Sequence, residues 1–485
     1  MAYVGNKPAL NYTTFAVQHF TTSATTGYTL DHAVTNENDI RLVINNVVQQ
    51  PGGSYAYTAA GTVLTLSSAT AGTDTMYCVF LGKAVQTVNP GAGSVGTSQL
   101  ATDAVTTVKI QDAAVTAAKT SGIPTLFLPT ANPIWINGNM AVSQRATSVT
   151  GKTAGGYYTV DRMQLDISGT IGTWTIAQEA QTSGNAIDNG FANAYRIDCT
   201  SATASPAASA FLKVISSFEG QDLQMFKKGT SNAQKFTLSF WVKSNKTGTA
   251  QVNLRDMDNT RMIGASYSIS VADTWEYKVC NFAADTTGKF DDDNARSLIV
   301  EWWLDGGSNY TSGAMPTAWE ARNAADSMAA GSLDMAGSTS NDFAITGIQL
   351  EVGEYTSSTI PPFQHESYGD NLARCQRYYY NTNPLNLTSA AISMGAMYTT
   401  TTAYGVIPFP VSMRTAPTGD FTTGTGYFMF NRNGAGDSFD TLSANNLTPT
   451  ICDVYASGSM SGTSGDGGRI RFDTTIAKIA FTAEL

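Results

Sequence analysis

Hydrophobic and polar residues alternate along much of the chain, as in β-strands that turn one face toward a core. The clearest stretches are FTLSFWVKS at residues 236–244 and LIVEWWLD at residues 298–305. The positions expected to face a core are Phe236, Leu238, Phe240, Val242, Leu298, Val300, Trp302 and Leu304. The positions between them, including Trp241 and Trp303, are expected to face outward.

Short patterned stretches separated by turn residues predict an all-β chain. The run FAITGIQLEV at residues 343–352 changes phase at Gly347, which indicates a β-bulge. Strands at this spacing, with both faces patterned, predict a two-sheet sandwich of the jelly-roll kind over residues 133–375. The sequence does not fix the order of its strands.

Two further β-domains are expected at the ends of the chain. Residues 1–86 contain strand patterns in IRLVINNVVQQPGG and in the stretch from Ser54 to Gly82, broken by turn residues. Residues 376–485 contain VIPFPVSMRTAPT and RIRFDTTIAKIAFTAEL. The chain is therefore expected to have several β-domains, joined at residues 87–132 by a linker.

That linker contains a repeat. Leu100, Val105, Ile110 and Val115 recur every fifth residue within a ten-residue unit. Neither a helix, with 3.6 residues per turn, nor a strand, with a period of 2, uses this spacing. A thin apolar line of this kind needs neighbours to cover it, so we expect a parallel homo-oligomer wound about its own axis. The alternative is a flexible linker rich in Ala and Thr.

Charged residues are only 14% of the 485 residues, and the net charge is -10. A protein this acidic does not neutralise phosphates, so we expect no nucleic-acid partner. The five cysteines have no disulfide or zinc spacing, which favours synthesis in a reducing cytoplasm. No secretion signal or stretch of about 18 apolar residues is found, so membrane insertion is not expected.

Several motifs occur in an order that resembles one group of proteins. They are INGNMAVSQRATS, YYTVDRMQLD, FEGQDLQMFKKGTSNAQKFTLSFWVKSNKTGT, VADTWEYKV and GIQLEVGEYTSSTIPPFQHESYGDNLARCQRYYY. Together they resemble the carbohydrate-binding-module-like sandwich of bacteriophage tail fibre proteins. The linker resembles the decad repeats of trimeric tail fibres, and the terminal domains resemble their tail-attachment and cell-distal ends.

This resemblance implies an elongated homotrimer in the virion tail, assembled in the cytoplasm of the bacterial host. Its N-terminal domain would bind the tail, a baseplate or an adaptor protein. The remaining domains would bind host surface polysaccharide, either lipopolysaccharide or capsule. Two alternatives stay open, a tailspike depolymerase and a purely structural fibre segment.

The candidate binding residues are the two outward tryptophans. An indole stacks on the apolar face of a sugar ring, and polar neighbours bind the sugar hydroxyls. The predicted sugar platform consists of Trp241, Lys243, Glu301, Trp303 and Asp305. The alternative is that these indoles lie under a loop or a neighbouring subunit. The aromatics Tyr404, Phe428 and Phe430 offer a weaker candidate in the C-terminal domain.

Catalysis and cofactors are not expected. Glu301 and Asp305 are four residues apart on a strand, about 13 Å, whereas the two carboxyl groups of glycosidases are roughly 5–9.5 Å apart. The glycines of residues 91–96 match a dinucleotide fingerprint but lack its strand–helix context. Residues 256–260 begin like an EF-hand loop but lack the oxygen ligand at the fifth position and the glycine at the sixth. The acidic run at residues 291–293 is interpreted as a solvated turn rather than as a metal site.

Overall fold

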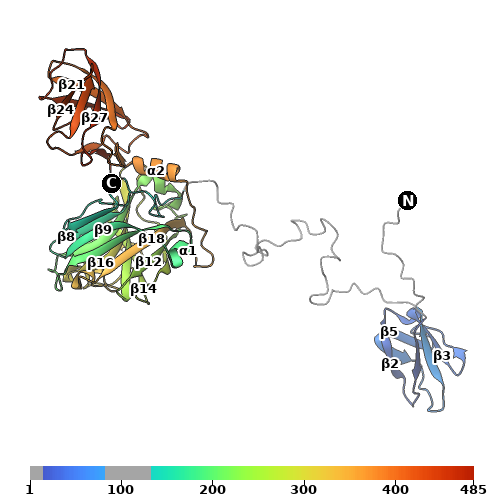
Figure 1. The fold of residues 1–485 in the computed structure, drawn as a ribbon. Helices are drawn as coiled ribbons and strands as arrows, with labels where there is room; N and C mark the ends of the chain where they lie inside the picture. Colours follow the sequence, from blue (N-terminus) through green and yellow to red (C-terminus); the bar gives the residue numbers. More distant parts are fainter. Residues whose placement is uncertain (1–14, 82–132) are drawn as a thin grey trace, which may run out of the picture. The chain divides into compact units, whose positions relative to one another are not determined.

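The computed structural model describes residues 15–81 and 133–485 (Figure 1). They belong to two compact units, one within residues 1–115 and one within residues 116–485. Strands make up most of the regular structure of both units, and the helices are short. The predicted all-β class is therefore confirmed.

The predicted stalk lies outside the described residues. This applies to the linker at residues 87–132 and to its repeat positions, Leu100, Val105, Ile110 and Val115. The winding of several chains around this repeat therefore stays a prediction.

The N-terminal unit (blue in Figure 1) has a four-stranded sheet of order β1-β6-β3-β4 and a two-stranded sheet β2-β5. Its elements are β1 (Val17–Phe20), β2 (Gly27–Val34), η1 (Glu37–Asp39), β3 (Ile40–Ile44), β4 (Val47–Val48), β5 (Tyr57–Leu66) and β6 (Met76–Phe80). Alternate residues face its core, so Leu64 is fully buried whereas the adjacent Val63 is 59% exposed.

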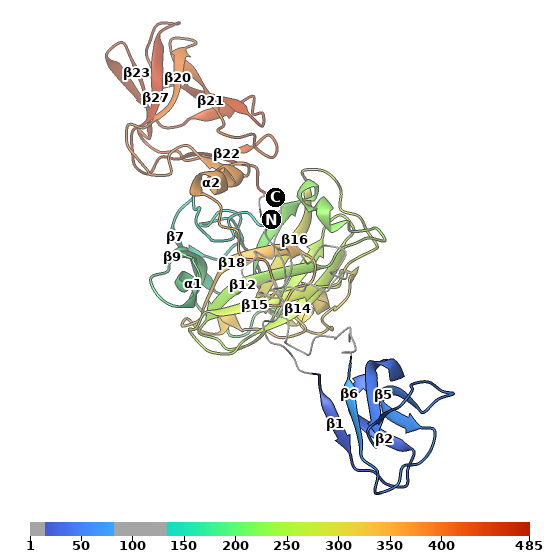
Figure 2. The ribbon, with the colours of Figure 1, turned by 90° about the vertical axis from the view of Figure 1, so that its right-hand side faces the viewer.

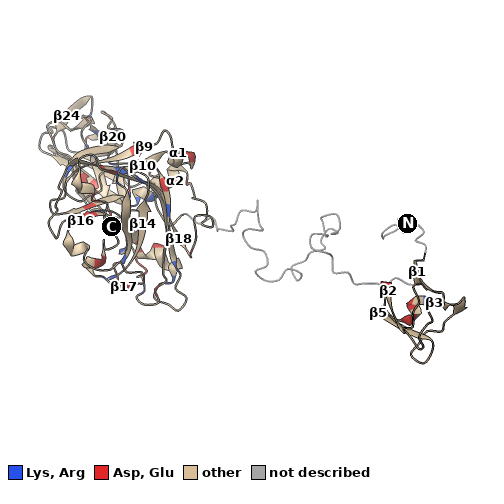
Figure 3. Ribbon diagram, turned by 90° about the horizontal axis from the view of Figure 1, so that it is seen from below, with Lys and Arg blue, Asp and Glu red and all other residues tan. Residues whose placement is uncertain are grey.

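The larger unit begins with a sandwich of two six-stranded antiparallel sheets. The first sheet has the order β15 (Glu276–Phe282), β12 (Phe236–Ser244), β18 (Asp342–Val352), β10 (Asn193–Ser201), β9 (Thr173–Ala180) and β7 (Ser148–Lys152). The second has the order β17 (Glu320–Ala321), β14 (Arg261–Ile269), β13 (Gly248–Asp256), β16 (Arg296–Gly306), β11 (Phe211–Glu219) and β8 (Gln164–Ser168). Figure 2 shows the sandwich from a second side, and Figure 3 shows that most of its ribbon carries no charge.

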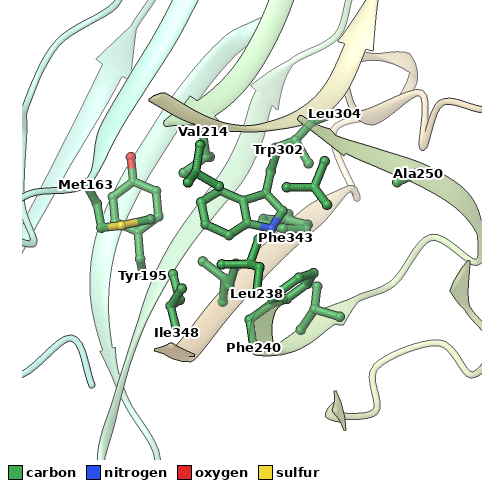
Figure 4. Close-up of a cluster of buried hydrophobic side chains, with 14 of the residues drawn as sticks. Met163, Tyr195, Val214, Leu238, Phe240, Ala250, Trp302, Leu304, Phe343 and Ile348 are labelled. Atoms are coloured by element: carbon green, nitrogen blue, oxygen red, sulfur yellow. The ribbon is translucent and has the colours of Figure 1, made fainter. Parts of the chain in front are cut away.

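The core between the two sheets comes from the residues that the alternation predicts. The eight core positions expected on β12 and β16 are all fully buried. The ring of Trp302 lies 5.6 Å from that of Phe240, in edge-on geometry (Figure 4). It lies 5.6 Å from the ring of Trp135, also in edge-on geometry. Edge-on aromatic pairs add about 0.5–1.5 kcal/mol to the effect of burial alone.

Short helices connect or cover these strands. They are α1 (Asn185–Asp188), η5 (Gly220–Phe226), η6 (Ser308–Tyr310), η7 (Ala324–Asp326), η8 (Met335–Gly337) and α2 (Tyr368–Gln376). Helix α2 begins after Ser367, whose hydroxyl accepts a hydrogen bond from the backbone N–H of Asp370 at 3.2 Å. A side-chain cap of this kind fixes the start of the helix.

The C-terminal domain has a three-stranded sheet, β19-β28-β22, and a seven-stranded sheet, β24-β23-β27-β20-β21-β26-β25. Its strands are β19 (Tyr379–Asn381), β20 (Ala391–Met397), β21 (Thr402–Pro408), β22 (Thr418–Phe421), β23 (Phe428–Arg432), β24 (Ala435–Phe439), β25 (Ser443–Asn445), β26 (Ile451–Ser457), β27 (Gly467–Phe472) and β28 (Ile479–Thr482). Its buried side chains form a cluster separate from the sandwich core.

A buried ionic cluster joins the sandwich to the C-terminal domain. The carboxylate of Glu219 accepts two hydrogen bonds from Arg377, both of 2.7 Å, and one from the Tyr378 hydroxyl. Arg162 donates to the carboxylate of Glu484, and its guanidinium lies 3.6 Å above the Tyr378 ring. We call these five side chains the junction cluster.

Candidate functional site

The five predicted platform residues do not share one face. Strand β12 directs Trp241 and Lys243 to the outer face of the first sheet, whereas β16 directs Glu301 and Trp303 to the outer face of the second. A register shift after Trp303 places Asp305 opposite the core residue Leu212, so Asp305 faces the interior of the sandwich. The two outer faces lie on opposite sides of the sandwich. The prediction of one shared platform is therefore wrong.

Trp303 is buried on the outer face of the second sheet, beneath loop residues. It is 1% exposed because loop residues around Tyr310 and around Asp326–Ser327 lie over the outer face of the second sheet. Its ring lies 5.1 Å from that of Tyr310 and 5.6 Å from that of Phe211. The alternative, that the indole lies under a loop, is correct for Trp303. Because the covering segment has no strand or helix periodicity, the sequence pattern does not reveal it.

Glu301 forms a buried ion pair beneath the same segment. It is 2% exposed, and Lys213 donates to its Oε1 at 2.7 Å. The Trp303 Nε1–H donates to Oε2 at 3.1 Å. Burial opposes ionisation, but the Lys213 ammonium outweighs it and holds the pKa of Glu301 below its ordinary range. Glu301 is therefore neither a solvated acid nor exposed to a ligand.

Asp305 also has a structural contact instead of an exposed position. Its carboxylate accepts hydrogen bonds from the backbone N–H of Gly306 at 2.7 Å and from that of Ala336 at 2.8 Å. The second bond fixes helix η8 against the sheet. Burial raises the pKa of Asp305.

Trp241, by contrast, lines an open hollow of about 460 Å³ on the first sheet. It pairs across the strands with Tyr277, and the two rings are 5.2 Å apart. The lining residues are Asn189, Phe191, Trp241, Tyr277, Gly347, Gln349, Ser357, Ile360, Pro361, Pro362, Phe363 and His365. We call this the Trp241 hollow.

A second aromatic group lies across the hollow. The ring of Phe191 is 4.9 Å from that of Phe363 and 5.4 Å from that of His365. The Gln349 side chain is held by hydrogen bonds that its amide donates to Glu351 at 2.8 Å and to the Pro361 carbonyl at 3.1 Å. The hollow thus combines aromatic rings with one fixed amide.

Gly347 makes the floor of this hollow possible. Strands β12 and β18 shift register between Ser239 and Trp241, so the predicted β-bulge at Gly347 is confirmed. Gly347 has a φ of 59°. A Cβ there would lie 2.8 Å from Phe191 Cζ and 2.9 Å from Trp241 Cδ1. Only glycine therefore lets the two aromatic groups come this close.

We predict that Gly347→Ala destabilises the sandwich more than Gly151→Ala does. Gly151 also has a positive φ, 68°, but its Cβ would meet nothing within 4 Å. Both changes should lower the free energy of unfolding by about 1–2 kcal/mol, because alanine is strained in the left-handed backbone conformation. At Gly347 alone, crowding of the new Cβ against the aromatic rings should lower it by a further amount of about 1–3 kcal/mol. Urea unfolding followed by tryptophan emission measures the difference, and equal losses would contradict it.

Lys243 lies beside a neighbouring hollow of about 430 Å³ on the same face. Its Nζ is 3.7 Å from a Glu179 carboxylate oxygen and 5.3 Å from the centre of the Trp275 ring. Trp275 donates a hydrogen bond to Gln181 at 3.0 Å. Lys243 is thus engaged in its own contacts, two residues along the strand from Trp241.

Most partners of Trp241 could not be identified from the sequence. Phe191, Tyr277, Gln349, Phe363 and His365 come from four separate segments that meet only through the strand order. One signal was present, since Tyr277 alternates with Trp275 in the run TWEY. In the C-terminal domain, Phe428 and Phe430 are fully buried and so are excluded as surface residues, whereas Tyr404 is partly exposed.

Among residues 15–81 and 133–485, no three His, Cys, Asp or Glu side chains converge as metal ligands. Asp256 instead holds the buried ammonium of Lys228 at 2.5 Å. No described helix is long and apolar enough to cross a bilayer.

No protein-family model matches the chain, and no curated protein matches it. It is similar to a putative sugar-binding protein from Bacteroides thetaiotaomicron, with a TM-score of 0.23 and 14% identity over 46% of this chain and 100% of that one. It is also similar to a family 11 carbohydrate-binding module of a Clostridium thermocellum cellulase, with a TM-score of 0.22 and 10% identity over 43% and 98%.

A third similar structure is the enzymatically active domain of tailspike protein 4 of bacteriophage CBA120. The TM-score is 0.22 and the identity 12%, over 39% of this chain. The match covers 19% of that tailspike chain. TM-scores of this size carry no argument about the function of this chain.

Proposed function

We propose that this chain is a subunit of a homotrimeric bacteriophage tail fibre that attaches to host surface glycans by binding without cleavage. The N-terminal domain would bind the tail, a baseplate or an adaptor protein. The protein would be assembled in the bacterial cytoplasm and act in the virion tail. The observation that carries the glycan-binding part of this proposal is the Trp241 hollow.

The chemistry of the hollow fits a sugar ring. Pyranose rings have apolar C–H faces that stack on aromatic side chains, and Trp241 and Tyr277 offer such rings side by side. Hydroxyl groups of the sugar need polar partners, and the lining includes the polar side chains of Asn189, Gln349 and His365. The lining contains no Asp, Glu, Lys or Arg, so an uncharged sugar is the best match.

The same lining supports binding without cleavage. Glycosidases use two carboxyl groups on either side of the scissile bond. Glu351 contacts the lining residue Gln349, but a single carboxylate does not supply such a pair. Glu301 and Asp305 lie on the other sheet and are 2% and 4% exposed.

Multivalency would convert weak sites into firm attachment. Three copies on one axis, as the repeat at residues 96–120 predicts, could bind a repetitive surface together. Linked sites exceed the affinity of one site by about 10²–10⁴ without any new contact. One weak binding site in each of the three chains is therefore sufficient for firm attachment.

We expect Trp241→Ala to weaken binding to isolated bacterial lipopolysaccharide or capsule by about tenfold or more per site, because it removes the stacking ring. Tyr368→Ala is the matched control, since Tyr368 is 61% exposed and lies outside the hollow. Biolayer interferometry across a panel of isolated polysaccharides measures both. Equal binding by wild type and Trp241→Ala would refute the site.

The alternatives predict different results with the same panel. A depolymerase would release reducing ends from the polysaccharide, whereas we expect none. A purely structural fibre segment would bind none of the polysaccharides in the panel.

A further inference from the structure

The C-terminal domain exposes an apolar face on its seven-stranded sheet. Neighbouring strands β20, β21 and β26 direct alternate residues outward (β20 and β21 are labelled in Figure 2). Met394 is 72% exposed, Tyr398 71%, Val406 46% and Ile451 39%. Large apolar side chains gathered on one face of a domain indicate an interaction surface.

Three tyrosines extend this face. The ring of Tyr404 lies 5.4 Å from that of Tyr398 and 5.4 Å from that of Tyr455. Tyr404 and Tyr455 are directly opposite each other on β21 and β26. Tyrosine and methionine are enriched in protein–protein interfaces, whereas charged residues are depleted from their centres.

Two opposite charges lie at the two sides of this apolar centre. Arg469 on β27 is directly opposite Met394, and Asp453 on β26 is directly opposite Val406. Met394 and Val406 are themselves neighbours, since they adjoin the paired residues Gly395 and Gly405. The row therefore runs from a cation through two apolar side chains to an anion.

Arg469 is the unusual member of this row. It is exposed, and its guanidinium makes no hydrogen bond or ion pair with any residue of the described chain. Asp453 accepts one hydrogen bond, from Asn446 at 2.7 Å, which leaves acceptor positions free. Each side of the row thus offers a charge that a neighbour of opposite sign can complement.

We infer that this face is where three copies of the chain meet around a common axis, with Arg469 of each copy paired with Asp453 of the next. A head-to-tail contact closes into a ring when the rotation between copies fits, and the homotrimer of the proposed function requires a rotation that closes after three. The apolar centres would then face the axis and the charges would pair at the seams. The inference rests on the homotrimer of the proposed function and adds the residues by which its C-terminal domains associate.

A disulfide test uses the spacing of the row. Arg469 and Asp453 lie three strand steps apart, about 14 Å, whereas a disulfide needs Cα atoms roughly 4.4–6.8 Å apart. Cysteines at both positions of the full-length chain therefore cannot bridge within one copy. The five native cysteines are all buried and free, so they do not compete.

We expect the double variant Arg469→Cys/Asp453→Cys to migrate as a covalent trimer on a non-reducing gel after mild oxidation. Each single variant should stay a monomer on the gel, because its cysteines do not face one another. A dimer as the only cross-linked product would overturn the three-fold arrangement. Monomers alone would overturn this face as the interface.

Light scattering of the same samples separates this inference from the proposed function. A native trimer that does not cross-link refutes the interface but leaves the trimer intact. A native monomer refutes both. As a second variant, Arg469→Glu/Asp453→Arg should keep the trimer that either single reversal weakens, and equal weakening by all three would contradict the pairing.

Discussion

Lys213→Met is expected to lower the free energy of unfolding of the sandwich by about 3–5 kcal/mol. The change leaves the Glu301 carboxylate, 2% exposed, without the ammonium that is now 2.7 Å away. Arg255 is 3.7 Å from the same carboxylate and is the remaining cation. Urea unfolding followed by tryptophan emission measures the loss, since all seven tryptophans lie in the sandwich, between Trp135 and Trp319.

Two further variants test the reason for this loss. Lys213→Met/Glu301→Gln should regain part of it, because a neutral amide needs no cation and its oxygen still accepts from Trp303. Lys235→Met should cost at most about 1 kcal/mol, since its ion pair with Glu354 is exposed. Glycan binding by folded Lys213→Met should match wild type. A variant that loses binding but not stability would place Lys213 in the binding site.

The second large effect is expected at the junction cluster. Glu219→Gln should lower the stability of the larger unit at pH 7 by about 1.5–3 kcal/mol, the contribution of a hydrogen bond to a charged group. Burial opposes ionisation of Glu219, but the hydrogen bonds from Arg377 and Tyr378 outweigh it and hold its pKa below the ordinary value. A carboxyl with a lowered pKa contributes stability above its unfolded-state pKa of about 4.3.

That contribution is lost as pH falls through the folded-state pKa. Wild type and Glu219→Gln should therefore differ by several degrees in thermal midpoint at pH 7, at about 2–4 °C per kcal/mol, and converge in acid. Burial raises the pKa of Asp161 to about 6, which acts in the opposite sense, but both proteins contain Asp161 and the comparison cancels it. Calorimetry at pH 7 and pH 2.5 measures the difference, since the folded-state pKa of Glu219 lies below the ordinary value.

Glu354→Gln is the control for the acid experiment. Its carboxylate is 57% exposed and pairs only with Lys235 on the surface, so its midpoint should follow wild type at both pH values. A constant offset between wild type and Glu219→Gln from pH 7 to pH 2.5 would show that the carboxylate charge is not the cause.

The sequence was sufficient for the strands of the sandwich and for one irregularity. Alternation located β12 and β16 because a strand between two layers must bury every second residue, as Phe240 and Trp302 do. The phase change at Gly347 was informative for the same reason, since one extra residue turns every later side chain to the other face.

The outward faces were not predictable in the same way. A polar residue on a strand was interpreted as solvent-exposed, but Glu301 is buried because a distant segment covers it and Lys213 neutralises it. The alternation of residues shows which side chains of a strand share a face. It carries no information about a later segment of the chain that covers the outer face. Trp303 was therefore assigned to the surface, where only Trp241 belongs.

The binding hollow depended on information that alternation lacks altogether. Tyr277 and Phe191 reach Trp241 only because β15 is adjacent to β12 and because the segment before β10 lies next to the bulge. These adjacencies are properties of strand order, which short-range patterns do not specify. For the ten-residue repeat, the pattern in the sequence is clear. The residues that would cover it belong to other chains, so the structure of a single chain does not test it.

The C-terminal domain leaves and rejoins the rest of the fold at adjacent strands. Tyr379–Asn381 and Ile479–Thr482 pair side by side, and the junction cluster holds the residues next to both. Residues 382–478 thus begin and end at neighbouring strands, an arrangement in which modules are readily exchanged, although β22 within them pairs with β28 and Arg414 contacts Asn294 of the sandwich. A different domain grafted between these two strands would start and end beside the same junction cluster.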